Sequence, residues 1–350
     1  TSTCLPGNWL YNYKRTKSSV FNYRKRTQQE EEQKQLNEQN ETIKDIGKTF
    51  EKLEEQDKKL EEFSKTQKEK KNLNFNDKKK FEDFLKRQKN QEQLMKNFNK
   101  KLQENLDEFQ NEKKEDDPFK EDLKKRLKEN EEQLKKDEEL LKELEELKEK
   151  INKEEFTQKL EELAKQNKNK KRSMKQLLEL TKRFYVMKKA EKISKQLEEL
   201  SDDQENLSDK DKENTKEAQE KLNKDFEEVQ KDLEDLKRED KLLRKPMRIE
   251  RDEFLEDEIK YDQEQAKKAL EEKSQSEQEQ KMQDAQKQQQ KAKQNQKKAA
   301  KKIQKMSDML KNMAGGGGGG DQAAEDIDTL RQILENLLLY SFDQEELMNT

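Results

Sequence analysis

A lysine-rich tract towards the end of the chain has the residue types that bind anions. Residues 286–307 hold eight lysines and no acidic residue, with mostly Gln and Ala between them. On a helix, such ammonium groups could contact anionic lipid headgroups or nucleic-acid phosphates without reading a base sequence. A second interpretation pairs the tract with an acidic block elsewhere, such as residues 129–146, in an antiparallel bundle. The candidate polyanion-binding residues are Lys287, Lys291, Lys297, Lys298, Lys301, Lys302 and Lys305.

Nucleic acid is the less favoured of the possible polyanions. Neither this tract nor the shorter basic tract at 165–175 contains an aromatic residue. Proteins that bind nucleic acid without sequence preference usually stack its bases on aromatic side chains. A membrane surface or another polyanion therefore ranks before nucleic acid as a partner of these lysines.

The abundant acidic residues predict no reaction. Paired carboxylates catalyse only in a cleft that separates their pKa values, and the sequence indicates no cleft. Residues 208–213 lack the glycine of a calcium loop and place lysines between the acids. The glycine run at 315–320 is followed by an aspartate, not by the Lys-Ser/Thr pair of a phosphate-binding loop. We therefore expect a non-enzymatic protein with no catalytic residue, no metal ligand, no cofactor and no small-molecule substrate.

Composition favours long helices over a compact globule. Charged residues make up 46% of the 350 residues and hydrophobic residues 27%, against about 25% and about 45–50% in ordinary domains. Disordered chains share this polarity, but here the apolar residues are periodic and the formal net charge is only −3. The prediction is an all-α protein of elongated helical hairpins or coiled coil, with disordered joints and a short N-terminal strand remnant.

The stretch from 119 to 200 shows the helical period most clearly. Its apolar residues recur mostly at steps of three, four or seven, which places them on one stripe of an α-helix. Within 131–147, nearly all positions outside this stripe are charged. Such a helix has only a narrow apolar stripe to bury against a neighbour. The stripe consists of Leu123, Leu127, Leu134, Leu141, Leu144, Ile151, Phe156, Leu160, Leu163, Met174, Leu177 and Phe184.

Local signals divide the chain into seven segments. Thr27 and Glu30 have the spacing of a capping box, and Pro118 fits the first position of a helix. Pro246 interrupts a helical pattern, and a glycine run acts as a flexible joint. The expected segments are 1–26 (remnant of an upstream β-domain, or disordered), 27–117 (helical hairpin), 118–207 (central long helices), 208–245 (helix), 246–313 (one long polar helix), 314–320 (Gly linker) and 321–350 (C-terminal amphipathic helix).

The C-terminal segment differs from the others because its apolar face is wide. Roughly 20 residues carry this face, which is too apolar to stay in water alone. It could bind a partner protein, a second copy of the chain or the chain's own bundle. The candidate partner-docking residues are Ile327, Leu330, Leu334, Leu337, Leu338 and Phe342.

Several runs of residues resemble a known family. They are residues 16–27, 45–48, 245–247, the glycine run, 330–338 and 341–345. Together they resemble a large uncharacterised envelope protein family of the Bacteroidota, a domain of unknown function, whereas residues 1–15 depart from its pattern. The resemblance implies N-terminal membrane spans, immunoglobulin-like domains and then a long Lys/Glu/Gln-rich helical part. It implies no known reaction.

The same resemblance sets the expected location. It implies the periplasm-facing part of an inner-membrane protein in the cell envelope, with the membrane anchor outside this fragment; a cytoplasmic location is the alternative.

Two functional hypotheses follow. The first is a structural scaffold or tether that acts through coiled-coil spacing and a partner-docking C-terminal helix, with a protein partner or self-association through helices. The alternative is a coiled coil that binds polyanions or a membrane surface through the 286–307 tract.

Overall fold

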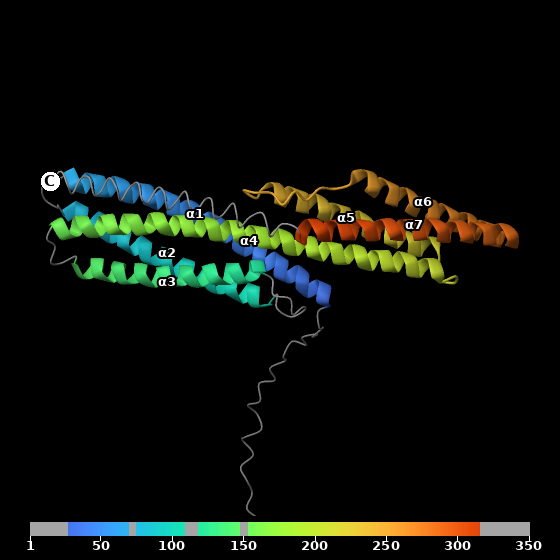
Figure 1. Cartoon of the computed structure of the whole chain (residues 1–350), viewed down its shortest axis with the longest axis horizontal. Coiled ribbons are helices and arrows are strands. Elements are labelled where there is room, and N and C mark those ends of the chain that lie inside the picture. The colour runs from blue at the N-terminus through green and yellow to red at the C-terminus, as the bar shows by residue number, and fades with distance from the viewer. Residues whose placement is uncertain (1–26, 70–74, 109–117, 148–152, 316–350) are drawn as a thin grey trace, which may run out of the picture.

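The computed structural model describes residues 27–69, 75–108, 118–147 and 153–315, and this part of the chain is all-α (Figure 1). The described residues form seven helices and no strand, which confirms the all-α part of the expected fold. The strand remnant expected in 1–26 and the helix expected in 321–350 lie outside the described residues. The helices are α1 (Gln28–Glu69), α2 (Phe75–Glu108), α3 (Pro118–Leu147), α4 (Lys153–Asp209), α5 (Lys216–Lys241), α6 (Glu253–Gln278) and α7 (Met282–Gly315).

These helices form two antiparallel four-helix bundles that share α4 (Figure 1). In the first bundle α1, α2, α3 and the N-terminal part of α4 each contact the next helix, and α1 closes the ring against α4. In the second bundle α4, α5, α6 and α7 do the same, and α7 closes the ring. α4 has 57 residues and is therefore about 85 Å long. The two bundles lie end to end as one rod.

The helix starts follow the capping rules. The Thr27 N–H donates to Glu30 Oε2 at 3.0 Å, and the Glu30 N–H donates to Thr27 Oγ1 at 3.2 Å. These reciprocal bonds confirm the predicted capping box at the start of α1. Pro118 is the first residue of α3, as predicted. Thr215 caps α5 by accepting a hydrogen bond from the Ala218 N–H at 3.2 Å.

One hydrophobic core runs through both bundles. The largest cluster of buried apolar side chains draws on all seven helices, so the core is continuous where the bundles meet on α4. A second cluster fills the far end of the first bundle, where the Phe63 and Phe81 rings stack with centroids 6.4 Å apart. The predicted stripe is confirmed wherever its side chains are described: Leu123, Leu127, Leu134, Leu141, Leu144, Leu160, Leu163, Met174, Leu177 and Phe184 are all buried.

The single long helix expected over 246–313 is wrong. α6 ends at Gln278, the chain reverses at Gln280 with φ 60°, and α7 returns antiparallel to α6. The physical reason lies in residues 271–281, which contain no apolar side chain. A helix continued through them would bury nothing, whereas the reversal packs the apolar stripes of α6 and α7 against each other.

The connection between α5 and α6 is ordered by a carboxylate. Asp240, which is buried, accepts hydrogen bonds from the Met247 N–H at 2.6 Å and the Ile249 N–H at 3.1 Å. Arg248 between them has φ 62°. Leu243 and Ile249 are buried in the main core, so this segment forms part of the wall of the second bundle.

Candidate functional site

The lysine-rich tract lies on α7, and its lysines fall into two groups. Lys297 pairs with Asp209 at 3.0 Å, and Lys302 pairs with Asp262 at 2.8 Å and Glu258 at 3.3 Å. The other candidates are exposed, and none has a carboxylate within 4.0 Å among the described residues. These are Lys287, Lys291, Lys298, Lys301 and Lys305, here called the lysine stripe.

The flanks of α7 are therefore neutralised while its outer side is not. Lys293 also pairs, with Asp211 at 2.6 Å, and the lysine partners hold the pKa values of Asp209 and Asp211 below their usual range. All these acids lie on α4, on α6 or in the turn after α4. The acidic block 129–146 lies on α3, in the other bundle, so it is not the counterpart of this tract.

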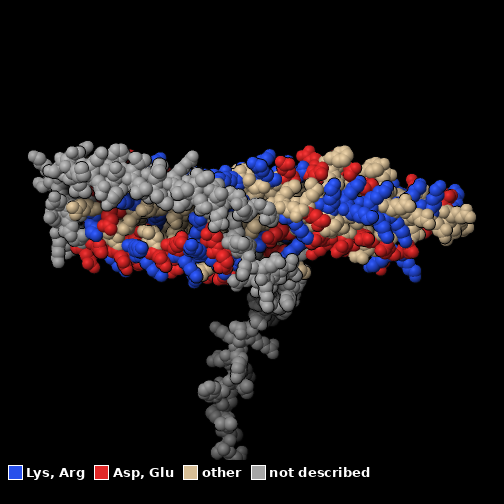
Figure 2. Space-filling view, in the orientation of Figure 1, with Lys and Arg blue, Asp and Glu red and all other residues tan. Residues whose placement is uncertain are grey.

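The lysine stripe follows one line along α7. Its members are separated by four, seven, three and four residues, so they share one side of the helix. The opposite side carries the buried Ala292, Ala299 and Ile303. From Lys287 to Lys305 the stripe is about 27 Å long. In Figure 2 blue side chains gather over α7, whereas red and blue alternate over the visible part of the first bundle.

A buried charge cluster crosses the first bundle. Lys170 of α4 is fully buried, and its Nζ lies 3.1 Å from Glu92 Oε1 of α2 and 3.0 Å from Asp137 Oδ2 of α3. Gln133 donates to the other carboxylate oxygen of Asp137 at 2.9 Å. Burial raises the pKa of Glu92, although Lys170 opposes the shift. Such a cluster fixes which residues of three helices lie at one level.

A layer of buried amides does the same in the second bundle. It contains one glutamine from each of α4, α5, α6 and α7 and one asparagine from the turn after α4. Each of these side chains is at most 2% exposed. Gln204 and Gln219 exchange hydrogen bonds of 2.8 and 3.0 Å, and Gln296 donates to Gln219 at 2.9 Å. Gln296 and Asn214 exchange bonds of 2.8 and 2.9 Å, and Gln263 donates to Gln204 at 3.3 Å. We call these five side chains the amide layer.

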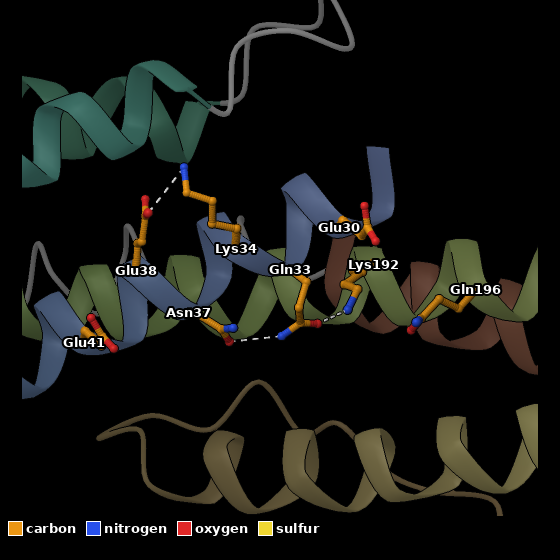
Figure 3. Close-up of a pocket in the computed structure, with 8 residues that line it drawn as sticks. All are labelled: Glu30, Gln33, Lys34, Asn37, Glu38, Glu41, Lys192 and Gln196. Carbon is orange, nitrogen blue, oxygen red and sulfur yellow. Dashed lines mark hydrogen bonds and ion pairs between the residues drawn. The ribbon is translucent and has the colours of Figure 1, made fainter. Parts of the chain in front are cut away.

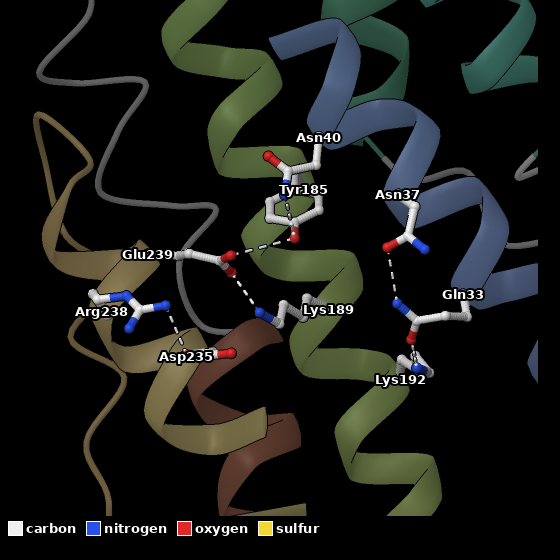
Figure 4. Close-up of polar contacts among 9 residues, drawn as sticks. All are labelled: Gln33, Asn37, Asn40, Tyr185, Lys189, Lys192, Asp235, Arg238 and Glu239. Carbon is white, nitrogen blue, oxygen red and sulfur yellow. Dashed lines mark hydrogen bonds and ion pairs between the residues drawn. The ribbon is translucent and has the colours of Figure 1, made fainter. Parts of the chain in front are cut away.

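Polar contacts also join the bundles where they meet (Figure 4). The Tyr185 hydroxyl of α4 donates to Glu239 of α5 at 3.4 Å and accepts from Asn40 of α1 at 3.5 Å. Lys189 pairs with the same glutamate at 2.8 Å. Burial and the nearby Glu239 raise the pKa of Tyr185. One side chain of α4 therefore links α1 of the first bundle to α5 of the second.

A shallow polar depression of about 440 Å³ lies between α1 and α4 (Figure 3). Lys192 at its edge donates to Gln33, and Gln33 donates to Asn37 at 3.0 Å. Burial lowers the pKa of Lys192. The lining consists of charged and amide side chains, and Gln33, Asn37 and Lys192 among them are bonded to one another.

The two ends of the described part meet at one place on the rod. Glu32, in the first turns of α1, pairs with Lys195 of α4 at 2.9 Å. Lys311, in the last turns of α7, pairs with Glu198, one turn further along α4. Ser307 also donates to the carbonyl of Ser194 at 2.8 Å. The described part therefore begins and ends near the middle of the rod.

No protein-family model, no curated protein and no solved structure matches the chain. The resemblance to the Bacteroidota envelope family thus stays a prediction.

Across the described ranges, no helix is long and apolar enough to cross a bilayer. The described side chains also contain no group of three or more His, Cys, Asp or Glu that could hold a metal ion. The partner-docking candidates Ile327, Leu330, Leu334, Leu337, Leu338 and Phe342 lie outside the described residues. The class that the fold defines is a tandem four-helix bundle.

Proposed function

We propose that this protein is a non-enzymatic scaffold, and that its described part is a rigid crossbar rather than an in-line spacer. The observation that supports this most directly is the position of the two ends of the described part. Glu32 and Lys311 bind residues only three positions apart on α4. A spacer separates its two attachment points, whereas this rod keeps them together and projects to both sides.

The rigidity of the crossbar comes from α4 and from the two polar clusters. α4 continues without interruption through both bundles, and the core around it is continuous. The Lys170 charge cluster and the amide layer penalise any shift between helices, because a shift would leave buried polar groups without partners. Two bundle surfaces are thereby held at fixed positions on either side of the attachment point.

In this proposal the segments outside the rod supply the location and the partner. The C-terminal segment 321–350 would bind a protein partner or a second copy through its apolar face. A membrane anchor elsewhere in the protein would hold the crossbar in the cell envelope, on the periplasmic side. The rod itself then sets the distance between whatever binds its two ends.

The geometry can be tested with pairs of spin labels on the full chain, because exposed positions exist at the middle and at both tips. Labels at Glu41 and Asn312 should lie on the order of 20 Å apart, about two interhelical spacings. Labels at Lys65 and Lys281 should lie about 85 Å apart, close to the length of α4. A long distance for the first pair would refute the crossbar.

The scaffold role itself can be tested by uncoupling the bundles. Residues 186–190 of α4 are replaced with an equally long Gly-Ser segment in the gene of the source cell, and growth is compared with that of a deletion strain. The proposal expects the uncoupled chain to fail as the deletion does, while circular dichroism still reports helical bundles. The matched control replaces exposed residues of α5 with alanine and should be silent. Full complementation by the uncoupled chain would refute a rigid scaffold.

A further inference from the structure

We propose that the face shared by α6 and α7 binds the surface of an anionic phospholipid bilayer. The first observation is the lysine stripe: five exposed ammonium groups without carboxylate partners among the described residues, on a helix with no acid between Asp284 and Asp308. Unpaired charges of one sign along a line produce a positive potential that attracts an anionic surface. Binding to a bilayer would be a function additional to the scaffold role, and it does not depend on that role.

The second observation is a set of exposed hydrophobic side chains on the same helical hairpin. Phe254 is 75% exposed and Tyr261 is 65% exposed on α6, and Met282 at the start of α7 is 63% exposed. The described residues contain only five large hydrophobic side chains that are exposed, so three of them lie on this hairpin. Phe254 and Tyr261 are seven residues apart and therefore share one side of α6.

The lysines and the aromatic rings lie side by side across the contact between the two helices. Glu258 of α6 pairs with Lys302 of α7 at 3.3 Å. Phe254 and Tyr261 precede and follow Glu258 by four and three residues, which makes them its neighbours on the helix surface.

The same relation holds on α7. Lys298 and Lys305 precede and follow Lys302 by four and three residues, so they are its surface neighbours. The pair between Glu258 and Lys302 thus has aromatic rings beside one partner and unpaired lysines beside the other. Cationic and aromatic groups in this arrangement match the polar boundary of a bilayer, where lysines contact phosphates and aromatic rings lie at headgroup level.

A flat lipid surface fits this face better than nucleic acid does. The stripe is straight over about 27 Å, so all five lysines can touch a plane at once, whereas the phosphates of a duplex curve away from a line. The stripe contains only lysine and no arginine, and arginine is the residue that reads phosphate and base edges with two bonds. The two aromatic rings are about 10 Å apart along α6, too far to stack on successive bases.

The test measures co-sedimentation of the full chain with vesicles. We expect binding to vesicles of phosphatidylglycerol and phosphatidylcholine, weaker binding in high salt, and none to phosphatidylcholine alone. Each lysine near an anionic surface contributes about fivefold to partitioning. Changing all five of the stripe to glutamine (K287Q, K291Q, K298Q, K301Q and K305Q) should therefore weaken binding by at least about a hundredfold.

A matched control separates this face from net charge. Five exposed lysines of α1 lie among acidic residues, and changing them to glutamine (K44Q, K48Q, K52Q, K59Q and K65Q) removes the same charge. This variant should keep its binding. Equal losses in the two variants, no loss in the stripe variant, or binding to duplex DNA in place of vesicles would each overturn the proposal. All ten positions are exposed, so both variants should fold, and circular dichroism checks this.

A spectroscopic measurement tests the aromatic part separately. Tyr261→Trp in a Trp9→Phe background places the single tryptophan of the chain on the proposed face. Its emission should shift to the blue with phosphatidylglycerol vesicles, because the ring leaves water. An unshifted spectrum under conditions where the protein sediments with the vesicles would show that the α6 side does not contact lipid, and would refute this orientation.

Discussion

Replacing the buried Lys170 with methionine should destabilise the protein strongly. The ammonium group is fully buried between Glu92 at 3.1 Å and Asp137 at 3.0 Å. Without it, two carboxylates remain in the core with no cation between them. Removing one partner of a buried ion cluster lowers the free energy of unfolding by about 3–5 kcal/mol. Domains are stable by only about 5–15 kcal/mol, so the loss is large.

Urea unfolding followed by circular dichroism measures this loss. The matched control is Lys168→Met, because Lys168 lies two residues away on the same helix and is exposed. Its free energy of unfolding should stay within about 0.5 kcal/mol of the wild type. A loss in Lys170→Met as small as that of the control would refute the buried position of the charge.

A triple variant tests whether the charges depend on one another. Glu92→Leu, Asp137→Leu and Lys170→Met together remove the whole cluster and replace it with apolar side chains. Such replacements are often neutral or stabilising by about 1–4 kcal/mol, so the triple variant should be more stable than Lys170→Met alone. A triple variant that is weaker than the single variant would contradict the cluster, because independent sites would add their losses.

Three further perturbations test other parts of the rod. Burial raises the pKa of Glu92 above its usual 4.5, so the folded state keeps this proton to a higher pH than the unfolded state, and the residue destabilises the fold as pH rises. The difference in free energy of unfolding between Glu92→Gln and the wild type should therefore change in favour of the variant from about pH 4 to about pH 7. Urea unfolding at both pH values measures this difference, and a difference that stays constant would contradict the prediction. Gln219→Leu removes both hydrogen bonds between Gln219 and Gln204 and the one that Gln296 donates to Gln219, which leaves the buried Gln204 amide N–H without its acceptor. The free energy of unfolding should fall by about 1–3 kcal/mol; an unchanged urea midpoint would argue against the amide layer. Gly47 lies inside α1 with nothing within 4 Å of an added Cβ, so Gly47→Ala should raise stability by about 0.5–1 kcal/mol in thermal unfolding, and a lower midpoint would show that helix entropy is not the controlling factor.

Much of the local structure could be predicted from the sequence because short-range rules determine it. The apolar stripe through Leu123 and Phe184 has the helical period, and its described members are buried. The capping box at Thr27 and the proline at the start of α3 depend only on neighbouring residues, so both predictions hold.

The buried polar residues could not be predicted from composition, because a lysine or glutamine is usually a solvated side chain. A weak signal existed. Lys170 lies seven residues from both Leu163 and Leu177, so it occupies a core position of the repeat. Gln296 lies seven residues before Ile303 in the same way. What the sequence does not indicate is which acid or amide of a distant helix faces each of them.

The reversal at Gln280 and the position of the two ends of the described part were missed for different reasons. A stretch without apolar residues is equally typical of a turn and of a frayed helix, and no glycine marks the positive φ at Gln280. The position of the ends depends on which seams pair, and periodicity alone does not encode this. For the lysine tract, the sequence indicated the helix correctly, but only the fold separates the paired Lys302 from the exposed Lys301.

Because a single helix serves both bundles, the order of synthesis matters. The first bundle can close once α4 has emerged from the ribosome, but the last turns of α4 also carry Ile193, Leu197 and Leu200, which are buried in the finished protein. The 106 residues from 210 to 315 that complete their cover take about 5–20 s to translate. During that interval the nascent chain exposes an apolar helix end beside an already folded bundle. We expect chaperones to bind this helix end, and α5–α7 to exchange between neighbouring chains from it.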